Sequence, residues 1–139
     1  MDIILRDVER KDWDFILELR NDFYSNFYQQ NKPLTKTEHY EYLEKQKSNP
    51  QFHHWIVEYQ NQMAGYVRIH SQDVGIMVKK EYQNKGIASE SLKQLEKKAH
   101  HLGIHKLVAM VKVENESSKT IFLKNNYKLK MYWLEKEIA

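Results

Sequence analysis

The spacing of apolar and polar residues predicts a strand, a loop and a helix in succession from residue 74 onward. Residues 74–78 form a short apolar run with the length and composition of a buried strand. Residues 79–85 are polar and typical of a loop. From Gly86 onward apolar residues recur at intervals of four and three, which is one face of an amphipathic helix. These residues are Ala88, Leu92, Leu95, Ala99 and Leu102.

The N-terminal part of the chain predicts one strand and two helices. Residues 3–7 favour a first strand, and Asp12 is a good N-cap for a helix that ends near Phe23. Thr35 or Thr37 caps a second helix that runs to residue 47.

A set of strands surrounds the central helix in sequence. Residues 52–59 alternate as a strand, and residues 63–70 return antiparallel to them before leading into residues 74–78. Gly103 predicts the end of the central helix, and residues 106–113 predict a further strand. A strand–helix–strand connection is a right-handed crossover, so this last strand lies parallel beside residues 74–78.

The C-terminal part predicts a short helix and strand structure. Residues 115–126 favour a helix with Asn115 or Ser117 as its cap, and residues 127–138 alternate well as strand. Two arrangements stay open, a minimal hairpin near residues 131–132 or one long strand that reaches into a partner. The sequence therefore leaves a homodimer open.

Composition indicates a single soluble domain over residues 1–139, with 41% hydrophobic content for its core. The absence of cysteine excludes disulfides, a thiol nucleophile and Cys-based metal sites. Gly103 separates His101 from His105, so these histidines do not form a metal pair on one helix. The N-terminus does not resemble a signal peptide, and no apolar run reaches the length of a membrane span. We expect a cytoplasmic protein without bound metal or membrane contact.

The net charge of +3 is small, and its distribution is more informative than its size. Lys79, Lys80 and Lys85 crowd the central loop, where they attract a phosphorylated ligand. No basic stripe with interleaved aromatic residues is present, so nucleic-acid binding is not expected.

The start of the central helix has the properties of an anion site. A helix N-terminus offers unpaired backbone N–H groups and the positive end of a dipole, and Gly86 lets the backbone approach a bulky ligand. The stretch Gln83-Asn84-Lys85-Gly86-Ile87-Ala88 resembles the Gln/Arg-x-x-Gly-x-Gly/Ala signature of the GCN5-related N-acetyltransferases (GNAT). Asn115, Ser118 and the run Ile121-Phe122-Leu123-Lys124-Asn125-Asn126-Tyr127 resemble the family's next block, in its order and spacing.

This resemblance implies a fold and a cofactor. The implied fold is the α/β (α+β) GNAT fold, with about four helices and a mixed, mostly antiparallel sheet of roughly six to seven strands. Its central parallel pair is splayed for coenzyme A, and Gly75 predicts a bulge that helps the splay. The implied cofactor is acetyl-coenzyme A, with its pyrophosphate on the loop amides. The implied cofactor-binding residues are Ile76, Met77, Val78, Gln83, Asn84, Lys85, Gly86, Ile87, Ala88, Asn115, Ser118 and Phe122.

The family's reaction requires little from side chains. A primary amine attacks the thioester, and the backbone N–H of Val78, by the resemblance, stabilises the negative charge that develops on oxygen. A base takes the ammonium proton, and an acid protonates the leaving thiolate. The family's usual acid is a tyrosine seven residues after the motif asparagine, which is Phe122 here. The glutamate of protein N-terminal acetylating branches is Met110 here.

The base must then come from a strand on the acceptor side, where His54, Glu58, His70 and Asp73 are the candidates, and the acid is either another group or absent. His70 and Asp73 are close in sequence to the central strand and are the predicted bases, while Tyr132 is the predicted proton donor. In the family, the segment between the first two helices forms a wall of the acceptor site. The predicted acceptor-binding residues are therefore Tyr24, Asn26 and Tyr28.

Two functions are consistent with these residues. The first is acetyl transfer from acetyl-coenzyme A to a primary amine of a small molecule, an amino sugar or a peptide. The second is a coenzyme A-binding module without turnover, which Phe122 and Met110 favour. Thiol release with a panel of amines separates the two, whereas cofactor binding alone does not.

Overall fold

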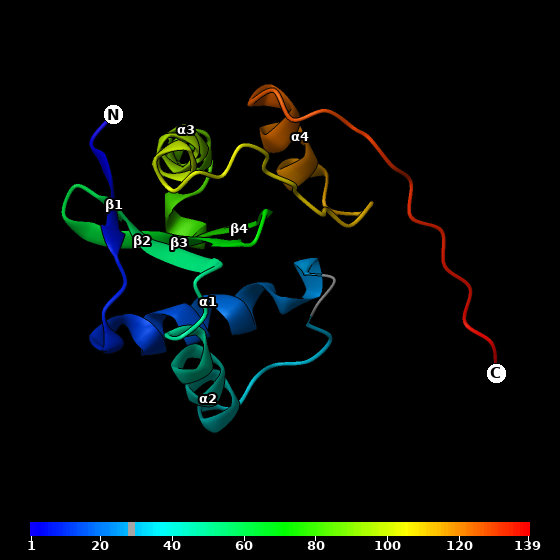
Figure 1. Ribbon diagram of the computed structural model, residues 1–139, viewed down its shortest axis with the longest axis horizontal. Coiled ribbons are helices and arrows are strands. Elements are labelled where there is room, and N and C mark those ends of the chain that lie inside the picture. Colours follow the sequence, from blue (N-terminus) through cyan, green and yellow to red (C-terminus); the bar gives the residue numbers. More distant parts are fainter. Residues whose placement is uncertain (28–29) are drawn as a thin grey trace.

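The computed structural model describes residues 1–27 and 30–139, whose helices and strands follow the predicted order (Figure 1). The strands are β1 (Ile3–Asp7), β2 (Phe52–Tyr59), β3 (Gln62–His70) and β4 (Asp73–Val78). The helices are α1 (Trp13–Phe23), α2 (Lys36–Gln46), α3 (Ile87–His101) and α4 (Glu116–Lys124). Short 3-10 turns lie at Arg10–Asp12, Tyr24–Asn26 and Lys80–Tyr82.

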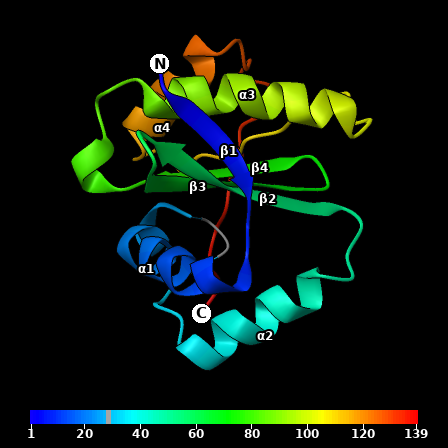
Figure 2. The ribbon, with the colours of Figure 1, turned by 90° about the vertical axis from the view of Figure 1, so that its left-hand side faces the viewer.

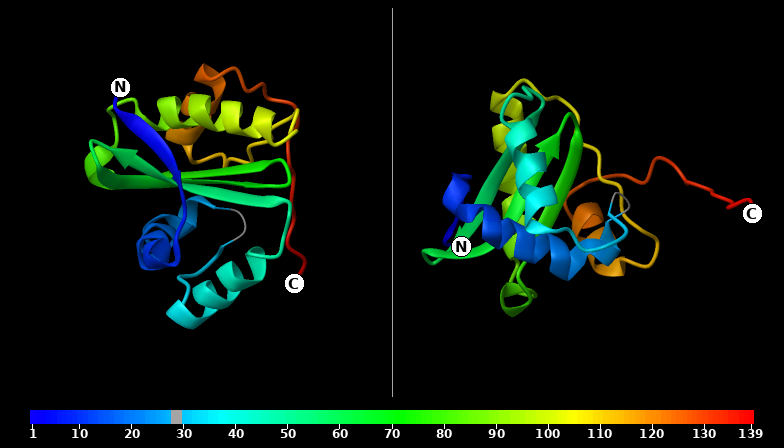
Figure 3. Two further views of the ribbon diagram at one scale, coloured as in Figure 1. Left: turned by 60° about the vertical axis from the view of Figure 1, so that its left-hand side comes forward. Right: turned by 90° about the horizontal axis from the view of Figure 1, so that it is seen from below.

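Helices cover both faces of an antiparallel sheet whose strand order is β1-β2-β3-β4 (Figures 2 and 3). α3 packs on one face, where Leu95 joins a buried cluster with Val67. α1 and α2 pack on the other face, where Ile16 and Leu43 meet Ile56. Because side chains alternate along a strand, neighbouring residues of β2, β3 and β4 belong to different layers.

Local signals explain where the helices begin. Thr35 Oγ1 accepts a hydrogen bond from Glu38 N at 3.2 Å, and Glu38 Oε1 accepts one from Thr35 N at 3.0 Å. This capping box starts α2, so Thr35 is the cap. Asn115 starts α4 in the same way, because its Oδ1 accepts a hydrogen bond from Ser118 N at 3.3 Å.

The predicted bulge at Gly75 is wrong. The register shift in the sheet falls between Val57 and Glu58 of β2, and Gly75 pairs regularly with Arg68 of β3. A Cβ on Gly75 would lie 3.2 Å from three atoms of the Arg68 side chain. Gly75 therefore provides the space in which Arg68 crosses β4.

The predicted strand at residues 106–113 is reduced to one parallel bridge between Asp73 and Val108. Val74 N donates to Val108 O, and Val108 N donates to Gln72 O, each at 2.8 Å. Further along the chain, a cleft separates residues 110–111 from β4. The parallel neighbour is thus present, but the splay begins directly after the bridge.

The predicted strand at residues 127–138 does not form, and this segment extends away from the rest of the molecule (Figure 1). Leu129, Met131 and Trp133 are 61%, 76% and 68% exposed. A strand needs a neighbouring edge for its backbone N–H and C=O groups, and the part of the chain that the structure describes offers none here. The sheet consequently has four strands, fewer than the six to seven expected.

Candidate active site

A loop rich in unpaired backbone N–H groups connects β4 to α3. Asn84 and Gly86 adopt positive φ angles of 62° and 81°, and Gly86 is the N-cap of α3. Within the described residues, no protein acceptor receives a hydrogen bond from the backbone N–H groups of residues 84–89. Consecutive free N–H groups at the positive end of a helix dipole favour a phosphate-bearing ligand. Residues 84–89 therefore fit the pyrophosphate of a coenzyme A cofactor.

Two side chains hold this loop in place. Gln83 Nε2 donates to Val78 O at 3.0 Å, which ties the loop to the end of β4. Ser91 Oγ donates to Ile87 O at 2.7 Å inside the first turn of α3, and Ile87 is buried in the core. The side chains of Gln83 and Ser91 thus support the loop, while the backbone N–H groups of residues 84–89 have no acceptor among the described residues.

An open cleft lies beside β4, between this strand and residues 110–111, with α4 along one side. Arg68 of β3 also lines this cleft, together with Gly75. The cleft brings together six of the predicted site residues, namely Asn26, Asp73, Ile76, Asn115, Ser118 and Phe122.

Asn115, the N-cap of α4, and Phe122, within α4, differ in what they can offer a ligand. Asn115 uses its Oδ1 as the helix cap, whereas its Nδ2 donates to no acceptor among the described residues. Phe122 is buried and packs edge-to-face on Tyr127 with ring centroids 4.9 Å apart. Burial raises the pKa of Tyr127 to about 12. Asn115 can therefore donate to a cofactor, and Phe122 provides an apolar wall.

The predicted catalytic residues lie in three different surroundings. Asp73 lines the cleft and accepts hydrogen bonds from Arg68, whose Nη2 lies 3.3 Å from Asp73 Oδ2. His70 is half-buried, with its Nε2 3.5 Å from Asn49 Nδ2. Tyr132 lies in the extended C-terminal segment and is 80% exposed. The structure therefore places only Asp73 in the cleft.

The predicted acceptor residues lie after α1. Asn26 lines the cleft and Tyr24 is half-buried in the same 3-10 turn, whereas Tyr28 lies outside the described residues. Lys112 Nζ donates to Ser25 O at 2.8 Å and so links this turn to the far side of the cleft.

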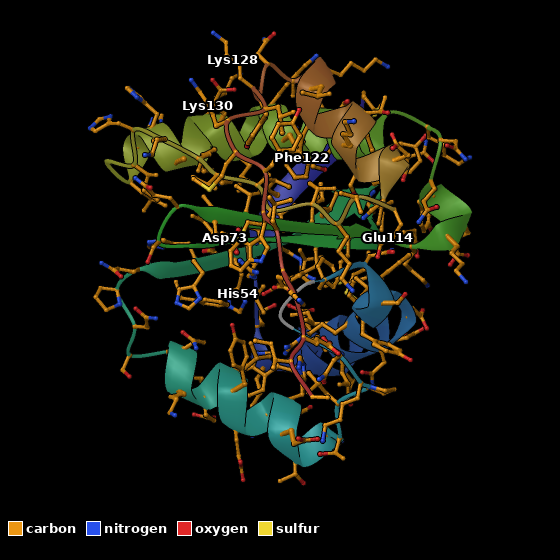
Figure 4. All side chains as sticks on the ribbon, turned by 90° about the vertical axis from the view of Figure 1, so that its right-hand side faces the viewer. His54, Asp73, Glu114, Phe122, Lys128 and Lys130 are labelled. Atoms are coloured by element: carbon orange, nitrogen blue, oxygen red, sulfur yellow. The ribbon has the colours of Figure 1, made fainter. Side chains whose placement is uncertain are left out.

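A polar pair that includes His54, one of the candidate bases, lies under the sheet. His54 Nδ1 is 2.9 Å from the hydroxyl of Tyr66, a buried residue of β3. Burial lowers the pKa of His54 to about 4 and raises the pKa of Tyr66, so both are neutral near pH 7. His54 and Tyr66 therefore form a hydrogen bond between two neutral groups. Figure 4 shows Phe122 above the sheet, His54 below it and Asp73 at its level.

Two arginines lie near polar groups under the sheet, Arg68 beside His54 and Arg20 beside His39. Arg20 is four residues after Ile16, so it lies on the side of α1 that faces the sheet. A charged residue at a position of the apolar helix pattern is the sequence signal for such a placement. Arg68 is the direct cross-strand neighbour of His54.

The fold and the loop of free amides define a protein that binds a phosphate-bearing cofactor beside a splayed parallel pair. A family model described as an acetyltransferase (GNAT) domain matches residues 2–128. The chain belongs to the GNAT acetyltransferase family.

Solved structures have the same fold. A spermidine N-acetyltransferase from Vibrio cholerae, in complex with CoA and spermine, has a TM-score of 0.85 at 23% identity, covering 99% of this chain and 87% of that one. An N-acetyltransferase from Staphylococcus aureus Mu50 has a TM-score of 0.76 at 25% identity, covering 92% and 84%. A putative acetyltransferase from Salmonella typhimurium, with acetyl-CoA, has a TM-score of 0.74 at 17% identity, covering 89% and 78%. The comparison with curated proteins gives no match.

The predicted family, fold, enzyme class and cofactor are confirmed: the chain is an N-acetyltransferase that uses acetyl-coenzyme A. Across residues 1–27 and 30–139, the structure has no helix with the length and apolar character needed to cross a membrane. The roles of the individual site residues, the absence of metal and nucleic acid, and a cytoplasmic location stay predictions.

Proposed function

We propose that the protein transfers the acetyl group of acetyl-coenzyme A to a primary amine of a small molecule, an amino sugar or a peptide by direct attack on the thioester. The observation that carries this proposal is the run of free N–H groups at residues 84–89 next to the cleft beside β4. The reaction forms a C–N bond and breaks the C–S bond. Coenzyme A leaves as the thiol after the amine has lost a proton to a base.

The residues divide between the two sides of the cleft. The N–H groups of residues 84–89 hold the phosphates, and Asn115 donates its free Nδ2–H to the cofactor. Asn26 and Asp73 border the same cleft from the acceptor side. Asp73 is better placed than His70 to take the ammonium proton, since it lines the cleft.

Thiol release measured with acetyl-coenzyme A and a panel of amines tests the proposal. The panel contains polyamines, amino sugars, amino acids and short peptides, and calorimetry measures acetyl-coenzyme A binding in parallel. We expect binding together with amine-dependent thiol release. Tight binding without release from any amine would instead favour the coenzyme A-binding module.

We also propose that residues 127–138 pair as a strand with residues 109–113 of a second copy of the chain. The extended segment has exposed apolar residues at alternating positions, including Leu129 and Met131, and Met110 and Val113 are 46% and 89% exposed. Two exposed extended segments of matching character favour β-sheet addition between copies.

Sedimentation velocity of the full chain tests this pairing. We expect a dimer, and we expect the double substitution Met131→Lys and Trp133→Lys to give a monomer that binds acetyl-coenzyme A unchanged. A monomeric parent at micromolar concentration would contradict the pairing.

A further inference from the structure

Arg68 and Asp73 lie on one face of the sheet, beside the cleft. Arg68 pairs with Gly75 across β3 and β4, and Asp73 is two residues before Gly75 in β4. Because side chains two residues apart on a strand point to the same face, Arg68 and Asp73 are diagonal neighbours, a separation that a long side chain can bridge. Both residues line the cleft, and their side chains are 16% and 19% exposed.

The Arg68 guanidinium contacts Asp73 at two places. Its Nη1 donates to the backbone O of Asp73 at 3.0 Å, and its Nη2 lies 3.3 Å from Asp73 Oδ2. Nη1 also lies 3.4 Å from the same Oδ2. A rigid, planar guanidinium that binds the backbone and the carboxylate of one residue restricts the rotation of that carboxylate. Arg68 therefore fixes the direction in which the Asp73 side chain points.

The other carboxylate oxygen of Asp73 is not used by the fold. Among residues 1–27 and 30–139, the hydrogen bonds of this carboxylate all go to Oδ2, and none goes to Oδ1. The parallel bridge holds the adjacent backbone, since Val74 N donates to Val108 O at 2.8 Å. A carboxylate that takes a proton from an ammonium group needs one oxygen within reach of that group. Asp73 Oδ1 meets this requirement for a ligand in the cleft.

Gly75 provides the space that this arrangement needs. The three atoms nearest to an added Cβ are Cγ, Nε and Cζ of Arg68, each at 3.2 Å. The backbone itself does not require glycine, because Gly75 pairs regularly in β4 and its φ angle is not positive. A side chain at this position would therefore displace Arg68 rather than strain the strand.

We propose that Arg68 is a positioning residue for acetyl transfer, which holds Asp73 by Oδ2 so that Oδ1 faces the attacking amine. The inference rests on the proposed function, in which Asp73 takes the ammonium proton. In that step an N–H bond breaks, the proton moves to Oδ1, and the electron pair left on nitrogen forms the C–N bond. Arg68 itself exchanges no proton, and it acts through Asp73.

A double-substitution cycle in kcat tests the inference. Arg68→Met is expected to lower kcat at saturating amine by roughly ten- to a hundredfold, the range for a reacting group held out of position. In an Asp73→Asn background the same substitution should change kcat less than about twofold, because the carboxylate through which Arg68 acts is gone. The readout is kcat, since the altered charge that a bound amine meets appears in KM.

Arg10→Met is the matched control, because it removes an exposed arginine paired with Glu44, and it should leave kcat unchanged in both backgrounds. A residue that only stabilises the fold lowers the rate in either background. Losses of kcat in Arg68→Met and Asp73→Asn that multiply in the double variant would therefore overturn the inference.

Gly75→Ala gives a second test that leaves both charged groups in place. It is expected to lower kcat by roughly three- to tenfold, since the guanidinium must shift by a fraction of an ångström. In an Arg68→Ala background, where the truncated side chain leaves room for the added methyl group, the change should be less than about twofold. An equal loss of kcat in both backgrounds would overturn the assignment of Gly75 to Arg68.

Urea unfolding separates a failure of this inference from a failure of acetyl transfer. The free energies of unfolding of the parent, Arg68→Met, Asp73→Asn and the double variant should be non-additive if the guanidinium holds the carboxylate. If no amine releases thiol, the proposed reaction fails, while a non-additive unfolding cycle still supports the hold of Arg68 on Asp73. An additive unfolding cycle, or thiol release in which the kcat losses multiply, would refute the positioning role alone.

Discussion

Gly86 and Gly103 offer a matched pair of substitutions that tests where the cofactor binds. They lie at the two ends of α3 with φ angles of 81° and 79°. An added Cβ at Gly103 meets nothing within 4 Å, and at Gly86 it meets only Met1 Cε at 3.1 Å, the free end of an exposed side chain. Because a side chain in this left-handed region costs about 1 kcal/mol, Gly86→Ala and Gly103→Ala should destabilise the protein equally. Each should lower Tm by about 4 °C.

Only Gly86 lies among the free N–H groups of residues 84–89. Gly86→Ala is expected to weaken acetyl-coenzyme A binding by about tenfold, since it places a methyl group where the backbone must approach the phosphates. Gly86→Trp is expected to abolish binding, and Gly103→Ala to leave it unchanged. A loss of about 1 kcal/mol is small beside a typical unfolding free energy of about 5–15 kcal/mol, so partial unfolding does not explain these differences.

Calorimetric titration with acetyl-coenzyme A and thermal unfolding of the same samples provide the two measurements. Undiminished affinity in Gly86→Trp would refute the placement of the cofactor at this loop. Equal losses of affinity in Gly86→Ala and Gly103→Ala would show that general destabilisation, rather than the lost approach to the backbone, weakens binding.

Four further predictions concern single side chains. Asn115→Asp keeps the helix cap but removes the Nδ2 donor and adds a charge. The affinity for acetyl-coenzyme A, measured by calorimetry, should therefore fall about tenfold with little change in Tm. Unchanged affinity would show that Asn115 only caps the helix. Burial lowers the pKa of His54 from 6.5 to about 4, so the unfolded chain binds the proton first as the pH falls. The free energy of unfolding therefore keeps the contribution of neutral His54 above pH 6.5 and loses about 3 kcal/mol as the pH falls towards 4. In urea unfolding, the free energy of unfolding of His54→Gln should depend less on pH than that of the parent. Asp73→Asn should lower kcat by about a hundredfold, and an unchanged kcat would exclude Asp73 as the base. Tyr132→Phe should lower kcat by at least about tenfold if this tyrosine is the proton donor, and an unchanged kcat would exclude it.

Elements with strong local signals could be predicted from the sequence. The Thr35 capping box, the Asn115 cap and the positive φ of Gly86 each depend on a few neighbouring residues, so the helix starts were predictable. The alternating pattern at residues 127–138 specifies two faces of an extended segment but not the edge it pairs with. For this reason the pattern predicted a strand where the described chain has none.

Of the candidate site, the cofactor side could be predicted from the sequence, whereas the arrangement of the acceptor side could not. The candidate cofactor loop could be predicted because its free N–H groups belong to consecutive residues, from 84 to 89. On the acceptor side, Asn26 and Asp73 are far apart in the sequence, and both line the cleft only because the segment after α1 lies beside the sheet in the folded chain. The importance of Gly75 was likewise hidden, since its neighbour in space is the side chain of Arg68 rather than a residue nearby in the chain.

The cofactor side depends on backbone groups and the acceptor side on side chains, and this difference affects how the protein selects its acceptor. The proposed cofactor site consists of backbone N–H groups, which most substitutions leave in place, whereas the charged side chains that line the cleft are those of Arg68 and Asp73. Replacing a guanidinium there changes the local charge by one unit without altering the loop at residues 84–89. Acceptor preference should therefore change under single substitutions that leave acetyl-coenzyme A affinity intact. A substitution at Arg68 that altered both to the same extent would show that the two sides of the cleft are coupled.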